Sequence, residues 1–271
     1  MTPRRIAFAN QKGGVGKTAT VTGLASAITA RGGRVLIIDM DPQGNATEGV
    51  GVPRGEDLAV YEGTTWALFI ESSQGRTGHV VEHIRPSKWD GVDVVAAHIN
   101  LANVEQGGGQ ETPWYVDLAL EDADLSMYAA ILFDCPPSLG NLLFSALNTV
   151  DSVIVVTEPT VDGVKGVKSL RKTVALVQKR PNPRLVIDGI VINKRRANGE
   201  HEFREEELRK SYGDMVARTV IPDYVARQDA HSAQIPIHRH RGGKSLALQV
   251  AYDDLLAELP IEVSTVSAGV K

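Results

Sequence analysis

Short runs of apolar residues recur along the chain and alternate with stretches whose apolar positions follow helical spacing. The runs are rich in Val and Ile, whose branched side chains suit strands that are buried on both faces of a parallel sheet. They predict six strands, at residues 6–9, 35–38, 92–96, 131–133, 153–156 and 185–192. The alternation therefore predicts an α/β fold, with a mostly parallel twisted sheet flanked by helices on both faces.

The first helix follows the first strand after a short loop. Val21, Leu24, Ala25 and Ile28 recur at the i, i+3, i+4, i+7 spacing of a helix with one buried stripe, and the pair Gly32-Gly33 ends it. The chain therefore opens as strand, loop, helix and strand.

The length and composition fit one globular domain. The chain has 271 residues, of which 42% are hydrophobic, enough to bury a core. Because no repeat, low-complexity tract or Pro/Ser-rich linker divides it, we expect a single domain over 1–271, with 260–271 as a loose tail. Residues 49–90 and 104–128 are interpreted as loops with short helices, and their role is not evident from the sequence.

Charge and cysteine content narrow the classes of function. Residues 1–160 hold 10 Lys and Arg against 19 Asp and Glu, whereas residues 161–271 hold 19 against 14. The basic second half keeps nucleic-acid binding open. The single cysteine, Cys135, excludes an internal disulfide framework and a Cys-x-x-Cys motif, which favours a reducing cytosol. No apolar run reaches the ~18 residues of a membrane span, so no membrane partner is expected.

A glycine-rich segment with two lysines lies between the first strand and the first helix, which is the context that a phosphate-binding loop requires. Its glycines let backbone N–H groups surround β- and γ-phosphate oxygens, the helix N-terminus adds partial positive charge, and Lys17 supplies a full one. Thr18 is expected to ligate Mg²⁺ through its hydroxyl. The predicted nucleotide-binding residues of this segment are Gly13, Gly14, Val15, Gly16, Lys17, Thr18 and Ala19.

A second lysine, Lys12, stands where the general pattern Gly-x-x-x-x-Gly-Lys-Ser/Thr has its first glycine. In this feature the loop resembles the deviant Walker A, or ParA/MinD, family of P-loop ATPases. The resemblance implies that Lys12 reaches across a nucleotide-sandwich dimer to the other subunit's phosphates, where a cation stabilises the transition state. Taken alone, Lys12 is also compatible with a solvated surface lysine.

Residues 39–47, at the end of the second predicted strand, look like switch I of that family. Carboxylates at this end of a parallel sheet face the ligand crevice. Asp41 is the residue expected to orient the attacking water, and Asp39 the one expected to hold the water shell of the magnesium. Both aspartates are also compatible with capping of the turn before Pro42.

Residues 131–140 have the form of a Walker B strand followed by the family's switch II. Asp134, which ends the apolar run, is expected to contact magnesium through water. Cys135 is interpreted as a small buried residue without a catalytic role, because no cationic or metal partner for it is identifiable.

Further along the chain, Asn193 closes the predicted strand 185–192. Members of the family that this chain resembles have Asn at the corresponding position. The resemblance therefore implies that the side-chain amide of Asn193 reads the adenine edge. The segment 219–223 corresponds to the family's segment around the base, with Pro222 as a wall. Asn193 is also compatible with a backbone cap at the end of an element.

The resemblance covers most of the chain and is closest to small ParA-type partition proteins. Because the chain begins directly at the first strand, we expect it to lack the helix-turn-helix domain of larger plasmid ParA proteins. Sequence-specific reading of DNA is therefore not expected.

Basic residues of the second half resemble the positions at which small ParA proteins bind nonspecific DNA. In the predicted helix at 164–179, lysines at i, i+3 and i+7 form a stripe opposite an apolar side. Such side chains neutralise phosphates and give salt-sensitive, sequence-independent binding, although each singly is also compatible with solvated surface. The expected DNA-binding residues are Lys165, Lys168, Lys172, Arg195, Arg196, Arg227, Arg241 and Lys244.

Other functional classes fit less well. A MinD-like membrane positioner needs a C-terminal basic amphipathic helix, whereas the predicted last helix, 245–259, offers Leu246, Val250 and Leu255 for core packing. An iron–sulfur carrier needs paired cysteines. Lys12 and Lys17 together with Asp41 and Asp134 favour hydrolysis over a non-catalytic DNA scaffold that is gated by nucleotide. An orphan ParA-like ATPase that positions another cargo, at membrane or nucleoid, stays open as an alternative.

The resemblance thus implies a Mg²⁺-dependent ATPase with weak intrinsic turnover. ATP pairs two protomers into a homodimer that binds nonspecific double-stranded DNA, and a ParB-type centromere-binding protein stimulates hydrolysis and release. Plasmid or chromosomal DNA is segregated in this way by a cytoplasmic, nucleoid-associated protein. The catalytic residues implied are Lys12, Lys17 and Asp41, and the residues around the metal are Thr18, Asp39 and Asp134.

Overall fold

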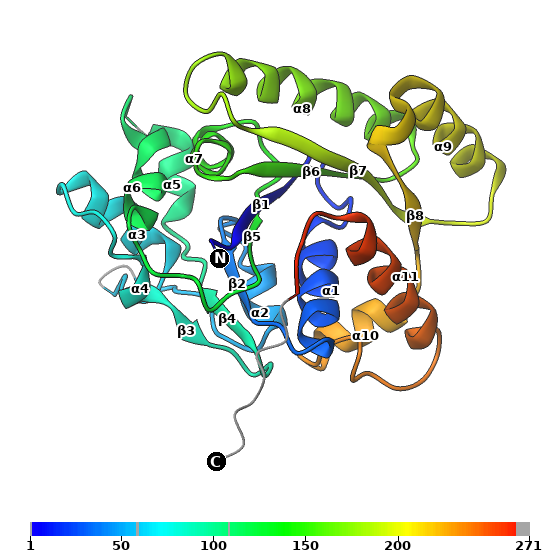
Figure 1. The fold of residues 1–271 in the computed structure, drawn as a ribbon, viewed down its shortest axis with the longest axis horizontal. Coiled ribbons are helices and arrows are strands. Elements are labelled where there is room, and N and C mark those ends of the chain that lie inside the picture. The colour runs from blue at the N-terminus through cyan, green and yellow to red at the C-terminus, as the bar shows by residue number, and fades with distance from the viewer. Residues whose placement is uncertain (1, 58–59, 108, 264–271) are drawn as a thin grey trace.

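The computed structural model describes residues 2–57, 60–107 and 109–263. An eight-stranded sheet, in the order β3-β4-β2-β5-β1-β6-β7-β8, forms its centre (Figure 1). Neighbouring strands are parallel except β3, which pairs antiparallel with β4. The strands are β1 (Arg4–Ala9), β2 (Val35–Asp39), β3 (Arg85–Pro86), β4 (Val92–Val95), β5 (Ala130–Asp134), β6 (Ser152–Thr157), β7 (Val186–Arg195) and β8 (Val216–Pro222).

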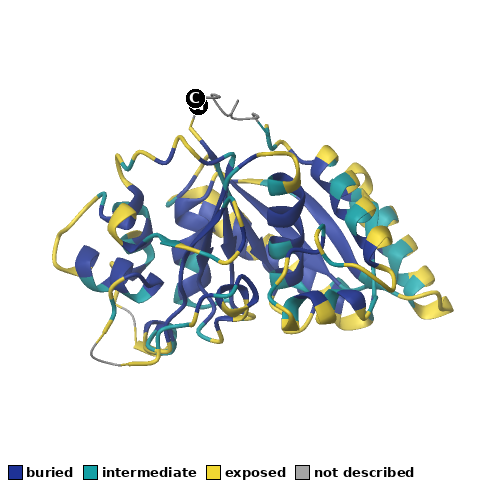
Figure 2. Cartoon of the chain, turned by 90° about the horizontal axis from the view of Figure 1, so that it is seen from below, coloured by how far each residue is buried: buried dark blue, intermediate teal, exposed yellow. Residues whose placement is uncertain are grey.

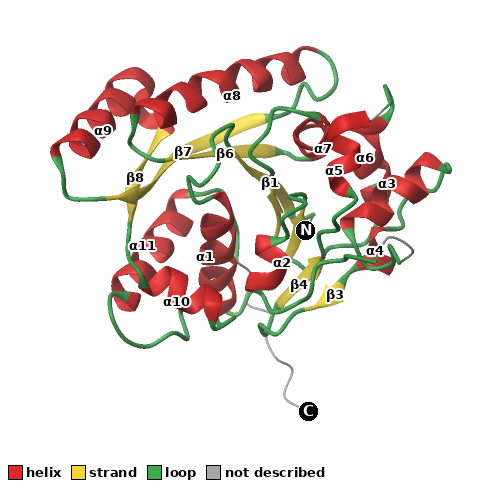
Figure 3. Cartoon of the chain, turned by 180° about the vertical axis from the view of Figure 1, so that it is seen from behind, coloured by secondary structure: helices red, strands yellow, loops and turns green. Residues whose placement is uncertain are grey.

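Helices cover both faces of this sheet, as Figure 3 shows from behind. The described α-helices are α1 (Lys17–Ala30), α2 (Asn45–Gly49), α3 (Thr65–Ser73), α4 (Val80–His83), α5 (Leu101–Gly107), α6 (Tyr115–Leu120), α7 (Asn141–Thr149), α8 (Val161–Lys179), α9 (Gly199–Tyr212), α10 (Ala226–Ser232) and α11 (Ser245–Glu258). Short 3-10 turns lie at Thr112–Trp114 and Gly213–Met215.

Two hydrophobic cores lie on opposite faces of the sheet, because successive strand side chains point to opposite sides. In β1, Ala7 and Ala9 face the core under α3 to α9, whereas Ile6 and Phe8 face the core under α1, α2, α10 and α11. The central strands are therefore buried on both faces, with exposed residues on the outer helices (Figure 2). This arrangement confirms the predicted α/β fold with helices on both faces.

All six predicted strands are present, with shifted ends, but two strands were not predicted. The edge strand β8 is mostly only half-buried, so it lacks the continuous apolar run of a central strand. The strand β3 is two residues long. The prediction that Asn193 closes its strand was wrong, because β7 continues to Arg195 and begins after Leu185.

The two helices that pack against each other near the site differ from expectation. Helix α1 is buried on more than one stripe, since it lies between the sheet and α11. In α11, Leu255 is buried as predicted, but Leu246 and Val250 are 70% and 50% exposed. The expectation that these two pack in the core was wrong, because the buried side of α11 carries Leu248, Tyr252, Leu255 and Leu256.

The start of the predicted tail packs against the molecule. Ile261 and Val263 are partly buried against the core under α1 and α11. The rest of the predicted tail, 264–271, lies outside the described residues. Among the described helices, none is both long and apolar enough to cross a membrane.

Candidate nucleotide site

The glycine-rich segment forms a loop between β1 and α1, as its sequence predicts. Gly14 and Gly16 have φ angles of 78° and 91°, in the left-handed region that glycine occupies without steric cost. The amide of Asn193 lies against this loop: its Nδ2 donates to the carbonyl oxygen of Gly16 at 3.0 Å and to Thr20 Oγ1 at 3.2 Å. A fully buried side chain from β7 therefore holds the end of the phosphate loop.

Asn10 holds the other end of the loop. Its Nδ2 donates to the carbonyl oxygen of Val156 in β6 at 2.7 Å, and its Oδ1 accepts from the Lys12 N–H at 3.0 Å. Val15 points into the core instead and is fully buried. The loop is thus tied to β6 and β7 and anchored by one apolar side chain, which makes it a rigid cradle for phosphate.

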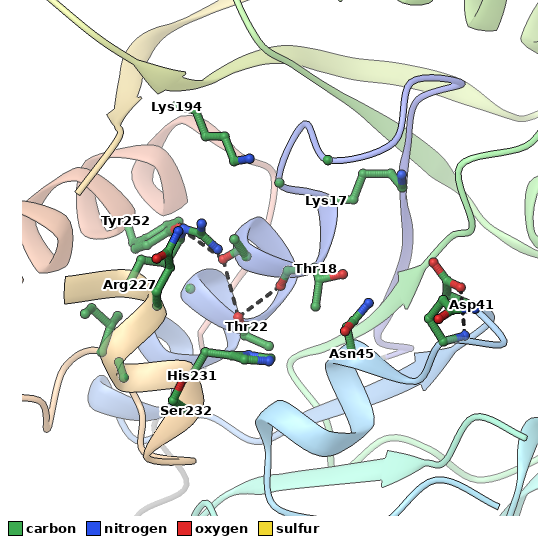
Figure 4. A pocket seen from close by; sticks show the side chains of 18 of the residues that line it. Lys17, Thr18, Thr22, Asp41, Asn45, Lys194, Arg227, His231, Ser232 and Tyr252 are labelled. Carbon is green, nitrogen blue, oxygen red and sulfur yellow. Dashed lines mark hydrogen bonds between the residues drawn. The ribbon is translucent and has the colours of Figure 1, made fainter. Parts of the chain in front are cut away.

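Lys17, the first residue of α1, faces a pocket of about 510 Å³ that begins at the phosphate loop. Its side chain is nearly buried, and burial lowers the pKa of its ammonium group, against the opposing effect of Asp134. In Figure 4, Lys17 and Asp41 lie on one side of this pocket and Arg227 and Tyr252 on the other. The ammonium group is therefore poised for an anionic ligand.

Thr18 and the two strand-end aspartates form an oxygen-rich cluster behind the loop. Asp39 and Asp134 are opposite each other in the pairing of β2 with β5, and Thr18 Oγ1 donates to Asp134 Oδ2 at 2.6 Å. The other oxygen, Oδ1, is buried without a hydrogen-bond partner among the described residues. Burial, and then the charge of Asp39, raise the pKa of Asp134 well above its usual value. This donor set fits Mg²⁺, which prefers oxygen ligands.

Asp39 also organises the loop that follows it. Its Oδ2 accepts from the N–H and the hydroxyl of Thr47 at 2.8 and 2.7 Å, and its Oδ1 accepts from the N–H of Asp41 at 3.2 Å. Burial raises the pKa of Asp39 to about 7 despite these bonds. Thr47 was not singled out from the sequence, although its hydroxyl links this aspartate to the N–H of Ala97, beyond β4, at 2.9 Å.

Lys12 lies apart from Lys17 and is not among the residues that line the pocket. Its Nζ donates to Thr160 Oγ1 at 3.2 Å and is 3.8 Å from Glu158 Oε2. The other oxygen of Glu158 is 3.3 Å from Nζ of Lys194, which does line the pocket. Neither Glu158 nor Lys194 was predicted from the sequence, because the ion pairs that Glu158 forms with Lys12 and Lys194 join residues that are distant along the chain.

The two residues expected around adenine, Asn193 and Pro222, lie in different parts of the structure. Asn193 has its amide nitrogen engaged by the phosphate loop, and its Oδ1 accepts from the Lys194 N–H at 2.7 Å. Pro222 lines a separate shallow groove between β8 and α11. Its role as a wall of the base site, like base reading by Asn193, stays a prediction.

The structure does not bring the predicted DNA-binding residues into one patch of the protomer. The three lysines of α8 are exposed on one face of the sheet, while Arg241 and Lys244 are exposed before α11 on the other. Arg227 lines the nucleotide pocket. Two of the arginines are paired with carboxylates: Arg195 Nε donates to Glu205 at 3.2 Å and Arg196 Nε to Asp223 at 2.6 Å.

A second polar cluster, Glu71, His79 and His83, is buried on the other side of the sheet. His83 Nδ1 accepts from the Gly63 N–H at 3.1 Å, which leaves the proton of a neutral ring on Nε2, 3.3 Å from Glu71. His83 therefore offers no free lone pair to a cation in this arrangement, and the carboxylate of Glu71 is paired with Arg76.

Together, the fold, the phosphate loop and the oxygen cluster define a P-loop nucleoside triphosphatase. The chain matches the AAA domain family model over residues 3–187. It is 36% identical over 257 residues to the sporulation initiation inhibitor protein Soj of Bacillus subtilis, covering 91% of this chain and 97% of that protein. It is 35% identical over 238 residues to the chromosome partitioning protein ParA of Caulobacter vibrioides, covering 86% of each.

The chain therefore belongs to the ParA/MinD family of ATPases and is of the small Soj type. Solved structures agree with the fold. Cobyrinic acid a,c-diamide synthase of Mycobacterium smegmatis, with bound ADP and magnesium, aligns at 25% identity with a TM-score of 0.75, covering 96% of this chain and 99% of that one. An ATP complex of Cyanothece McdA, 15% identical, has a TM-score of 0.81 with coverage of 96% and 97%, and shows the same fold.

Proposed function

We propose that this ParA-type ATPase segregates plasmid or chromosomal DNA through ATP-dependent pairing. Two protomers with bound ATP and Mg²⁺ close face to face, and the dimer binds nonspecific double-stranded DNA. A ParB-type centromere-binding protein then stimulates hydrolysis, which separates the protomers and releases the DNA. This cycle requires the protein to be in the cytoplasm and to associate with the nucleoid.

The observation that carries the proposal is the separation of the two loop lysines. Lys17 is buried at its own pocket, whereas Lys12 extends away from that pocket to Thr160 and Glu158 and stays about one-third exposed. One lysine therefore serves the phosphates of its own subunit, and the other, whose contacts lie outside that pocket, would exchange Thr160 and Glu158 for the phosphates of a second subunit. Slow turnover of the isolated protomer follows, since its site lacks this second cation.

The remaining roles follow from placement in the site. The backbone N–H groups of the loop and Lys17 would bind the β- and γ-phosphates, and Thr18, with Asp134 acting through water, would hold Mg²⁺. The metal, when bound, neutralises charge on the transferred phosphoryl group. Asp41 is nearly buried at the pocket, and its Oδ1 accepts from the N–H of Gln43 at 2.9 Å. This restricted carboxylate is suited to orienting the attacking water.

DNA binding is supported by the exposed lysine stripe of α8. Lys165, Lys168 and Lys172 are exposed on one helix, and Lys165 has an acidic neighbour only at 3.9 Å, Asp162. Because pairing doubles this basic surface, the dimer should bind duplex more tightly than the protomer. Binding of this kind weakens steeply with salt, by roughly tenfold or more between 50 and 200 mM.

The test compares Lys12→Ala and Asp41→Ala by light scattering and ATP turnover. With a nonhydrolysable analogue, wild type should become a dimer and Lys12→Ala should stay a protomer that still binds nucleotide. Asp41→Ala should dimerise with ATP and remain on random duplex, because hydrolysis is lost. A wild-type protomer at saturating analogue would contradict the proposal, and recruitment to anionic vesicles instead of duplex would favour a membrane positioner.

A further inference from the structure

The turn of switch I that follows Asp41 is held partly by its own backbone. The N–H of Gly44 donates to the Asp41 carbonyl oxygen at 2.9 Å, and the Gln43 N–H donates to the Asp41 carboxylate at the same distance. Gly44 has a φ angle of 69°, and no side chain caps the start of α2 that it precedes. None of these bonds uses the carbonyl oxygens of Pro42 and Gln43, which have to accept hydrogen bonds from elsewhere.

Arg54, from the segment whose role could not be read from the sequence, satisfies both. Its Nη1 donates to the carbonyl oxygens of Pro42 at 3.2 Å and Gln43 at 3.1 Å. Its Nε and Nη2 donate to Glu56 Oε1 at 3.1 and 2.8 Å, so one guanidinium bridges the turn and a carboxylate. The planar fork of donors in arginine makes such a bridge specific in direction.

The side chain of Arg54 also closes over the turn by direct packing. A Cβ atom on Gly44 would stand 2.8 Å from Cβ and 2.9 Å from Cδ of Arg54, closer than carbon atoms approach. The arginine stem therefore lies against the glycine backbone, and any larger residue at position 44 would push it away.

The backbone of Arg54 is itself attached to the sheet. Its neighbour Gly55 donates to the carbonyl oxygen of Ala97 at 2.8 Å and accepts from the N–H of Ile99 at 2.9 Å, and it forms a parallel bridge with His98. These residues directly follow β4. Arg54 thus connects the segment that follows the carboxyl end of β4 to the turn beside Asp41.

We propose that Arg54 is a positioning residue for hydrolysis, which sets the direction of the Asp41 carboxylate without touching nucleotide. The inference rests on the proposed role of Asp41. The chain of contacts is short: Arg54 holds the carbonyl of Gln43, and the N–H of Gln43 holds the carboxylate of Asp41. A brace that removes freedom from this turn keeps the attacking water in line, and misplacement by about 1 Å costs up to about a hundredfold in rate.

The experiment measures ATP turnover and the affinity for a nonhydrolysable analogue in Arg54→Ala, Arg54→Lys and Asp41→Ala. Arg54→Ala should lower kcat by about ten- to a hundredfold while analogue affinity stays within about twofold. Arg54→Lys should recover part of the rate, because one ammonium group can reach the carbonyls but cannot also make the forked bridge to Glu56.

Arg85→Ala is the matched control. Arg85 also donates to a backbone carbonyl of the same segment, that of Glu62, but within the described part of the chain it forms no hydrogen bond or ion pair with switch I. Its removal should leave kcat unchanged. Amide hydrogen exchange over residues 40–48 should rise in Arg54→Ala and not in Arg85→Ala.

The two single variants separate the inference from the proposed function. If Asp41→Ala abolishes turnover and Arg54→Ala keeps the turnover of the wild type, the positioning role is wrong. If Asp41→Ala retains full turnover, the proposed role of Asp41 fails instead. An equal fall in analogue affinity and kcat in Arg54→Ala would show a merely structural effect.

Discussion

The phosphate loop and switch I border the same pocket, but they are held in different ways. The phosphate loop adopts its shape through glycines with left-handed backbone angles, and one buried amide, that of Asn193, locks it. Switch I has a single such glycine, Gly44, and depends on the side chain of Thr47 at its own end and on that of Arg54 from the segment that follows it. The first loop takes its shape mainly from the backbone angles of glycine, and the second takes its shape mainly from side-chain hydrogen bonds.

The difference matches what each loop has to do. A triphosphate cradle gains from being preformed, because no ordering remains to be done when the ligand binds. A loop that holds Asp41, the residue proposed to orient the attacking water, can be adjusted by its braces without changing the cradle. Changes in the phosphate loop should therefore act first on nucleotide binding, and changes in the switch I braces on stability and turnover.

The largest expected effect is that of Lys17→Ala, which should weaken ATP binding by about a hundredfold or more, since hydrogen bonds to charged groups contribute about 1.5–3 kcal/mol each. Binding of a fluorescent ATP analogue measures this loss. Burial lowers the pKa of Lys17, so its removal should not lower the melting temperature of the nucleotide-free protein. A variant that melts early would mean that the loss reflects unfolding.

On the switch side, Thr47→Val should lower the free energy of unfolding by about 2–4 kcal/mol, because it leaves the buried N–H of Ala97 and one bond of Asp39 unsatisfied. Urea denaturation of the nucleotide-free protein measures the change. Thr47→Ser keeps the hydroxyl that bonds to Asp39 at 2.7 Å and should cost less than about 1 kcal/mol. A loss in Thr47→Ser as large as that in Thr47→Val would show that the methyl group, which Ser lacks and Val keeps, matters as much as the hydroxyl.

Two glycines of the phosphate loop provide a matched pair. A Cβ at Gly16 would stand 2.2 Å from Nδ2 of Asn193, whereas a Cβ at Gly14 would meet nothing within 4 Å. Gly14→Ala should lower the free energy of unfolding by about 1–2 kcal/mol, because of its left-handed backbone angle alone. Gly16→Ala should lower it more, because the amide of Asn193 must also move. Equal stabilities in chemical denaturation would show that the amide lock is not important.

Asn193→Ala distinguishes the two interpretations of that residue. Loss of the bonds to Gly16 and Thr20 should weaken ATP and GTP binding by the same factor, about tenfold for a cost near 1.4 kcal/mol. If the amide instead reads the adenine edge, ATP binding should fall and GTP binding should not. Competition of both nucleotides against one fluorescent probe separates these results.

The last prediction concerns pH. The pKa of Asp39 is raised from 3.8 to about 7 by burial, so the folded protein binds more protons than the unfolded chain between about pH 4 and pH 7. This contribution to the free energy of unfolding is present below pH 4 and is lost as pH rises through about 7, by at most about 1.4 kcal/mol per pH unit. Urea denaturation between pH 5 and 7.5 should show a flatter slope in Asp39→Asn, and an unchanged slope would contradict the assignment.

Much of the site was predictable because its signals are local. The phosphate loop combines its glycines and lysines within seven residues, and Asp39 and Asp134 end apolar runs that pair in a parallel sheet. The braces carry no such signal. Arg54 stands in a segment of mixed charges, and Glu105 of α5, which accepts from the Leu142 N–H at 3.1 Å after switch II, is equally inconspicuous. Both regions left without a role thus contain residues that contact a switch, as Arg54 does, or the helix that follows one, as Glu105 does.

The errors in the fold have a related cause. Leu246 and Val250 are as apolar as the buried residues of α11, and only the direction in which α1 lies decides which side is covered. Strand β8 was missed since its burial is partial and the carboxylate of Glu258 accepts two of its N–H groups, from Arg218 and Thr219. The pattern of apolar residues along a helix or strand does not show where the element that packs against it will lie.

By itself, the amino-acid sequence determined the class of fold, the phosphate loop and the strand ends that carry the aspartates, because each depends on neighbours within a few residues. Only the tertiary structure decided that Asn193 locks the loop, that Lys12 is turned away from its own pocket, and that Arg54 braces switch I. Those arrangements join residues up to 177 positions apart, such as Gly16 and Asn193. Contacts of that range arise when packed layers bring the chain together, and no local propensity encodes them.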